Sequence, residues 1–138
     1  MTTEERDVWA NISTKHDLAA DEVISALQKE IRRGHTENAA LLAYELLATS
    51  AELEEKLWQR LQVINVEDIG CGQLDAPVLI HALYQMHHQF PRPQGDRFLF
   101  ALHAARYLCG CQKDRSSDEM FNWVKHAVEE DGKRPVIP

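Results

Sequence analysis

The chain has 138 residues, of which 44% are hydrophobic and 27% are charged, and its formal net charge at pH 7 is −7. A chain of this length fits one domain with its own core, and this composition excludes collagen-like and disordered chains. The negative charge argues against strong unaided binding to a nucleic-acid backbone, because phosphate contacts need clustered lysine and arginine.

Six helices and no strand are predicted along the chain. We expect residues 1–18 to form a partly helical N-terminal arm, because Val8, Trp9 and Ile12 have the spacing of an amphipathic turn. Residues 19–132 should form a single helical domain, and residues 133–138 should form a tail.

The first three helices follow one another closely. Apolar residues at helical spacing predict helices over residues 21–34 and 36–49, with Thr36 as the N-cap of the second. The second helix should have an alanine-rich face that allows close helix contact, formed by Ala39, Ala43 and Leu46. Ser50 is the expected N-cap of a third helix, whose apolar stripe ends before the sequence EDIGCG. This stripe consists of Leu53, Leu57, Leu61 and Ile64, with Trp58 beside it.

The fourth helix should begin after Asp75, and the prolines of residues 91–96 predict a loop. A fifth helix is predicted over residues 97–111, and a sixth begins at Ser116, which has Glu119 at capping-box spacing. Because the connections are mostly short, we predict an all-α fold, a compact array of about six mostly antiparallel helices. The expected buried residues are Leu79, Leu83, Met86 and Phe90 in the fourth helix and Phe98, Leu102, Ala105 and Cys109 in the fifth.

The sequence carries no pattern typical of nucleotide or metal binding. It contains neither a GxxxxGK[ST] phosphate loop nor a GxGxxG turn, and its histidines and cysteines lack the spacings of a zinc site. The N-terminus does not resemble a signal peptide and no apolar run could cross a bilayer. We therefore expect a cytoplasmic, non-enzymatic protein without cofactor or metal, in which Cys71, Cys109 and Cys111 are reduced.

Glu67 and Asp68 raise a question, because the C-terminal end of a helix disfavours acidic residues. A catalytic acid pair flanks its substrate, whereas adjacent helical residues point about 100° apart. We therefore favour a structural role, in which these acids hold the turn Glu67, Asp68, Ile69 and Gly70. One of them would accept backbone hydrogen bonds from the sequence IGCGQL or pair with an arginine such as Arg60 or Arg33.

Arg32, Arg33, Lys113 and Arg115 are candidate partner-binding residues. All four lie near predicted helix ends, where basic side chains complement the helix dipole. Together in space they would form a patch for nucleic acid or an acidic protein segment, although direct DNA binding should be weak.

Several segments resemble one protein family in order and spacing. They are DEVISALQKEIRRG, ALLAYELL, LWQRLQVINVEDIG, DAPVLIHALYQ and ALHAARYLCGCQKDRSS. They resemble the C-terminal helical domain of the replication-associated recombination ATPases, the bacterial RarA/MgsA group, which is related to clamp loaders. The similarity covers most of the chain, residues 17–130.

The resemblance implies a clamp-loader-like collar that assembles subunits, typically into tetramers, at stalled or gapped replication forks. In that family an AAA+ ATPase module precedes this domain, and its ATP-binding residues have no counterpart in this sequence. The turn also differs, because the family usually has EDIGLADP where this chain has the longer EDIGCGQLDAP.

The function expected from the sequence is a non-enzymatic assembly domain linked to DNA replication or recombination-repair. It would form a homo-oligomer, a dimer or a tetramer, by burying an apolar helix face that includes Trp9 or Trp58. It would also dock a replication or repair protein, or an ATPase. Two alternatives stay open: a metal-binding or thiol-dependent protein that uses the cysteines and histidines, and an acidic regulator of a DNA-binding protein.

Overall fold

The computed structural model describes residues 9–93 and 95–138. Within these ranges the chain forms six α-helices and no strand, which confirms the predicted all-α fold. None of these helices is both long and apolar enough to cross a membrane. The helices are α2 (Ala20–Arg33), α3 (Thr36–Thr49), α4 (Ala51–Ile64), α5 (Ala76–His87), α6 (Gly95–Gly110) and α7 (Ser116–Glu129).

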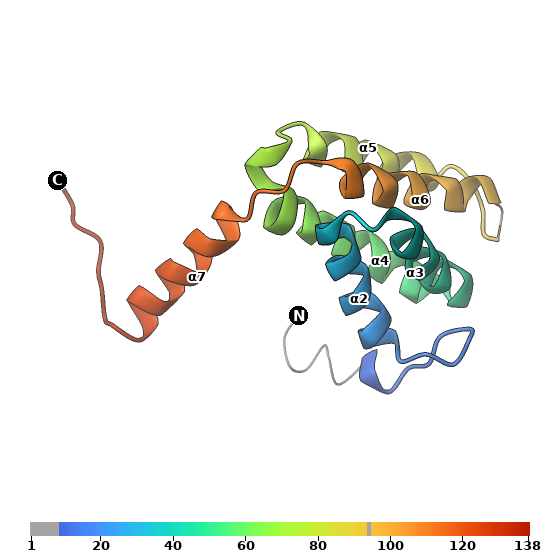
Figure 1. Ribbon diagram of the computed structural model, residues 1–138, viewed down its shortest axis with the longest axis horizontal. Helices are drawn as coiled ribbons and strands as arrows, with labels where there is room; N and C mark the ends of the chain where they lie inside the picture. The colour runs from blue at the N-terminus through green and yellow to red at the C-terminus, as the bar shows by residue number, and fades with distance from the viewer. Residues whose placement is uncertain (1–8, 94) are drawn as a thin grey trace.

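Helices α2 to α6 pack around one apolar core, and α7 extends away from them (Figure 1). α3 packs against α2, α4 and α6, while α5 packs along α6. α7 makes its main contacts with two short turns that follow α4, the π turn η1 (Asn65–Ile69) and the 3-10 turn η2 (Gly70–Gly72). The helical array is therefore built by α2 to α6, and α7 is attached at one end.

Small residues let the central helices approach one another closely. The predicted alanine-rich face of α3 is buried through Ala39 and Ala43. α6, which packs against α3, also has three fully buried alanines, Ala101, Ala104 and Ala105. Close packing of this kind maximises dispersion contacts in the core.

The described part of the N-terminal arm docks on α3. The Thr14 hydroxyl donates a hydrogen bond to the Glu45 carboxylate at 2.7 Å, and the backbone N–H of Lys15 donates to Thr49 Oγ1 at 2.9 Å. Trp9 is half-buried against the core. Val8, which the sequence placed on the same amphipathic turn, lies outside the described residues.

One of the predicted helix caps is confirmed and two are wrong. Ser50 Oγ accepts a hydrogen bond from the backbone N–H of Leu53 at 3.1 Å. Thr36 and Ser116 are instead the first helical residues of α3 and α7. Before α7, it is the Asp114 carboxylate that accepts a hydrogen bond from the backbone N–H of Ser116, at 2.9 Å.

The buried face of α5 differs from the predicted one. Leu83 is buried as expected, whereas Met86 is 44% exposed. The face that packs on the core also contains a histidine, which a count of apolar residues misses. It consists of Ala76, Ile80, Leu83 and His87.

Glu54, in the first turn of α4, is a buried carboxylate that holds the loop between α5 and α6. It pairs with Arg97 Nη2 at 2.7 Å and with Arg92 Nη1 at 3.2 Å. Arg97 also donates a hydrogen bond to the Phe90 carbonyl at 2.8 Å, and Arg92 donates to the Leu47 carbonyl at 2.9 Å. Two arginines therefore neutralise this charge and fix the loop on the bundle.

His87 is buried beside the same region and stacks on Trp58, with ring centroids 4.8 Å apart. Its Nδ1 contacts the Tyr84 carbonyl oxygen, while its buried Nε2 has no hydrogen-bond partner. Burial lowers the pKa of His87 below the usual imidazole range, and the charges of His88 and Arg97 act in the same direction.

This histidine predicts a loss of stability in mild acid. The unfolded chain takes up a proton near the usual histidine pKa of about 6.5, whereas the folded chain takes it up only at lower pH. The free energy of unfolding should therefore fall as the pH drops below that value, and His87→Phe should reduce the fall. Urea unfolding at neutral and mildly acidic pH measures this, with His81→Gln as the exposed control. An unchanged pH dependence in His87→Phe would contradict the assignment.

Candidate functional site

The acidic pair singled out by the sequence lies in the π turn η1, directly after α4. A π turn holds an additional residue, so the side chains that follow are rotated relative to those of an uninterrupted α-helix. Val66 faces solvent and Asp68 is fully buried. Asp68 is the centre of a group of charged and amide side chains that we call the Asp68 cluster. Its members are Gln28, Arg32, Glu67, Asp68, Arg115 and Asp118.

The buried Asp68 carboxylate is contacted from two other parts of the chain. Arg32 Nε on α2 lies 2.6 Å from Asp68 Oδ1, and Gln28 Nε2 donates to Asp68 Oδ2 at 2.9 Å. Arg115 Nε, just before α7, lies 3.3 Å from Asp68 Oδ1. A buried carboxylate needs this kind of compensation, because its desolvation is costly without paired charges and hydrogen bonds.

The remaining members link the cluster to α7. Arg115 Nη2 donates a hydrogen bond to Asp118 in the first turn of α7 at 2.8 Å and lies 3.8 Å from Glu67. Glu67 also accepts a hydrogen bond from Gln28 at 3.0 Å. The sequence named Arg60 or Arg33 as partners of the acids, but Asp68 pairs with Arg32 and Arg115. Arg60 instead donates to the Gln28 side chain at 3.3 Å.

Two glycines after the acids let the segment before α7 lie directly on the turn. Gly70 has φ of +51°, and a Cβ atom there would be 2.6 Å from the Asp114 carbonyl oxygen. A Cβ atom on Gly72 would be 2.1 Å from the Gln112 carbonyl oxygen. The backbone N–H of Asp114 donates to the Asp68 carbonyl at 2.9 Å. The link between α6 and α7 therefore contacts the EDIGCG sequence through backbone atoms as well as through the Asp68 side chain.

The four candidate partner-binding residues have different surroundings. Arg32 and Arg115 meet at Asp68. Lys113 donates hydrogen bonds from Nζ to the carbonyls of Cys109 and Cys111, at 2.9 and 2.7 Å, which caps the end of α6. Arg33 is 61% exposed, and its closest ion-pair partner is Glu30 at 3.8 Å.

The three cysteines do not form a reactive group. Cys71 is exposed, Cys109 is buried and Cys111 is half-buried. Burial raises the pKa of both the Cys109 and the Cys111 thiol, which disfavours the nucleophilic thiolate near neutral pH. Across residues 9–93 and 95–138, no three His, Cys, Asp or Glu side chains are arranged to hold a metal ion.

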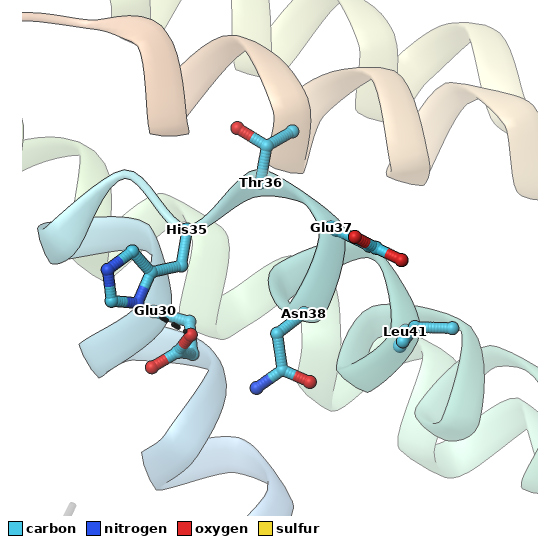
Figure 2. A pocket seen from close by; sticks show the side chains of 6 residues that line it. All are labelled: Glu30, His35, Thr36, Glu37, Asn38 and Leu41. Carbon is cyan, nitrogen blue, oxygen red and sulfur yellow. Dashed lines mark hydrogen bonds and ion pairs between the residues drawn. The ribbon is translucent and has the colours of Figure 1, made fainter.

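A shallow hollow of about 450 Å³ lies where α2 passes into α3 (Figure 2). His35 and Glu30 face each other across a distance of 3.0 Å, and Glu37 and Asn38 project from the first turn of α3. The two carboxylates already supply the negative charge that the N-terminal end of α3 favours. This hollow therefore offers little attraction to an anionic ligand.

Helix α7 has several large apolar side chains that the bundle leaves uncovered. Met120, Phe121 and Trp123 are 67%, 64% and 60% exposed, and Val124 and Val128 are partly exposed. Ala127 is the one α7 residue that is buried. The chain folds back after Gly132, so that Lys133 Nζ lies 5.3 Å from the centre of the Trp123 ring. The resulting hollow of about 360 Å³ is lined by Trp123, Val124, Ala127, Val128, Lys133, Arg134 and Pro135.

The tryptophan predicted for an exposed face is not the one found there. Trp58 is fully buried in the core, which corrects its proposed role in docking. Trp9 is half-buried against the core, and Trp123 is the exposed tryptophan among the described residues. The spacing of Met120, Phe121, Trp123, Val124 and Val128 gives α7 an apolar arc wider than one packing stripe. That width was the available signal in the sequence.

Comparison with known proteins assigns no family. The chain matches no protein-family model and no curated protein.

Replacing the buried carboxylate tests the Asp68 cluster. Asp68→Ala removes the charge shared by Arg32 and Arg115, and it should lower the free energy of unfolding by about 3 to 5 kcal/mol, the usual cost of breaking a buried pair. Urea unfolding followed by circular dichroism measures the loss. Glu67→Gln, at the more exposed neighbour, is the matched control and should cost much less. Equal effects at the two positions would show that burial of Asp68 is not the cause.

The close approach at the turn predicts that alanine substitutions at two glycines, Gly70 and Gly132, differ in their cost to stability. Gly70→Ala places a Cβ atom against the Asp114 carbonyl in a backbone conformation that side chains rarely adopt. It should destabilise the fold by roughly 3 kcal/mol. Gly132 also has positive φ, but a Cβ atom added there meets no atom within 4 Å, so Gly132→Ala should cost less stability. Thermal unfolding of both variants compares them directly, and the reverse order would contradict the close approach.

Proposed function

We propose that this chain is a non-enzymatic assembly domain that joins copies of itself through the apolar face of α7. The observation that carries the proposal is the exposure of Met120, Phe121 and Trp123 on one helix that the bundle does not cover. Large exposed apolar patches mark interaction surfaces, because leaving them in water is unfavourable.

The size of the patch fits a second copy of the chain. A Trp or Phe side chain carries roughly 150 to 250 Å² of surface, so the exposed side chains of α7 offer on the order of 500 Å². Two copies would bury about 1,000 Å² in total, which is where specific interfaces begin. Val124 lies near the middle of the apolar face, so two α7 helices can pair antiparallel about a two-fold axis.

The resemblance to the collar of replication-associated recombination ATPases supports the same role and adds a setting. In that setting the domain would assemble a dimer or tetramer in the cytoplasm and serve DNA replication or recombination-repair, with an ATPase or a repair protein as a further partner. Direct DNA binding would be weak. Arg32, Lys113 and Arg115 already have internal partners, and the net charge of the chain is −7.

Light scattering after size-exclusion chromatography tests self-association. The average mass should rise with protein concentration, and Phe121→Glu should return the chain to a monomer, because a carboxylate is costly to bury in an apolar interface. Leu41→Glu is the matched control, since Leu41 is 63% exposed on α3, away from the face. It should leave the mass unchanged.

Two outcomes would contradict the proposal. One is a strictly monomeric parent chain at high micromolar concentration. The other is an equal loss of association in Leu41→Glu and Phe121→Glu. Circular dichroism of each variant checks that the helices remain folded.

A further inference from the structure

The first turn of α7 is joined to the bundle mainly through charged groups. Arg115 precedes the helix and lies 3.3 Å from Asp68, 3.8 Å from Glu67 and 2.8 Å from Asp118. Asp118 belongs to α7, whereas Glu67 and Asp68 belong to η1. The Arg115 guanidinium is therefore the positive charge that lies between the acid of α7 and the two acids of the turn.

Among the described residues, no large apolar contact fixes the rest of α7, which extends away from the bundle (Figure 1). Its large apolar side chains are exposed, and its main neighbours are the two short turns η1 and η2. A helix that does not pack on the core has no apolar contact along its length to hold its direction. Its angle to the bundle then depends on the polar contacts and the backbone at its attached end. For α7 these are Arg115 with its partners and the hydrogen bond from Asp114 to the Asp68 carbonyl.

The contact at the base is an ion pair that leaves one donor unused. Arg115 Nε is buried and has no hydrogen-bond partner, although Asp68 Oδ1 lies 3.3 Å away. Arg32 Nε already occupies the same carboxylate oxygen at 2.6 Å. The attraction that holds Arg115 on Asp68 is therefore mostly electrostatic, so it depends on the charge of the guanidinium.

We propose that Arg115 is a positioning residue, which sets the angle at which α7 presents its apolar face, and that the charge of the Asp68 cluster thereby controls assembly. Within the cluster three carboxylates, Glu67, Asp68 and Asp118, face the guanidinium groups of Arg32 and Arg115. Removing the Arg115 charge takes away the positive group that Asp118 shares with Glu67 and Asp68, and the like charges of these acids repel one another. The first turn of α7 then moves away from η1. The part of the inference that concerns assembly rests on the proposed function, whereas the part that concerns the angle does not.

Spin labels can measure the angle directly. One label replaces the exposed Glu129 at the end of α7 and the other replaces the exposed Gln85 on α5, in a chain whose three cysteines are replaced by serine or alanine. Pulsed electron resonance then gives the distribution of distances between the two labels. Excess unlabelled chain ensures that each assembly holds at most one labelled copy. The cysteine-free chain serves as the parent once its melting curve matches the native one.

The variants separate charge from geometry. Arg115→Gln removes the charge, and Arg115→Lys keeps the charge but lacks the planar guanidinium with its paired N–H donors. Arg33→Gln is the matched control, because it removes the same charge from a more exposed arginine whose ion-pair distance is 3.8 Å. In Arg115→Gln we expect a broader and shifted distance distribution and a dissociation constant raised about tenfold, within the usual range of coupling between two separate sites. Arg115→Lys should restore much of both, and Arg33→Gln should change neither.

The outcomes distinguish the two proposals. If the parent chain is monomeric but Arg115→Gln still changes the distances, the positioning role stands and the assembly role fails. If the parent assembles while Arg115→Gln leaves both the distances and the dissociation constant unchanged, the positioning role is refuted and the proposed function survives. If Arg33→Gln acts as strongly as Arg115→Gln, net charge is the cause, and the positioning role is again refuted.

Discussion

The buried carboxylate of Asp68 is the constraint on which the end of the bundle depends. A buried charge must be neutralised by neighbouring groups, and in this fold those groups come from distant parts of the sequence. Arg32 and Gln28 come from α2, and Arg115 comes from the link that leads into α7. One side chain therefore fixes the positions of α2, the π turn after α4 and the base of α7 relative to one another. Apolar contacts alone would not specify these positions as narrowly.

The same solution appears at the opposite end of α4. Glu54 lies in its first turn and is neutralised by Arg92 and Arg97, while Asp68 lies just beyond its last turn. Each carboxylate pairs with an arginine from a non-helical connection. Arg92 of the α5–α6 loop pairs with Glu54, and Arg115 of the α6–α7 link pairs with Asp68. The core between them is apolar and alanine-rich. Helix α4 thus has a buried carboxylate near each end, and these two carboxylates hold the two connections that apolar periodicity does not define.

The sequence predicts the helices because apolar spacing and glycine breaks are local signals. It identifies the alanine face of α3, the cap at Ser50 and the turn at Glu67 and Asp68, each of which depends on neighbouring residues. It misses what depends on distant ones. The two arginine partners of Asp68 lie 36 and 47 residues away along the chain, and the π turn after α4 has no local signature. His87 is missed because a polar residue on a buried face is recognised only from its surroundings. The exposure of α7 is missed because an amphipathic pattern indicates a face that packs but not the surface it packs on.

Charged contacts at the base of α7 orient the helix, while its large apolar side chains stay exposed. This is how α7 can extend from the bundle and still have a defined direction. An apolar face provides affinity but little orientation, so a helix held only by such a face would settle against the nearest core. The link through Asp114, which lies on Gly70 and donates to the Asp68 carbonyl, leads the chain away from the core before α7 begins. Arg115 then holds the first turn at η1. In the assembly that we propose, the free energy of burying Phe121 and Trp123 would be released in a contact with a second copy, and the cluster would determine the direction of that contact.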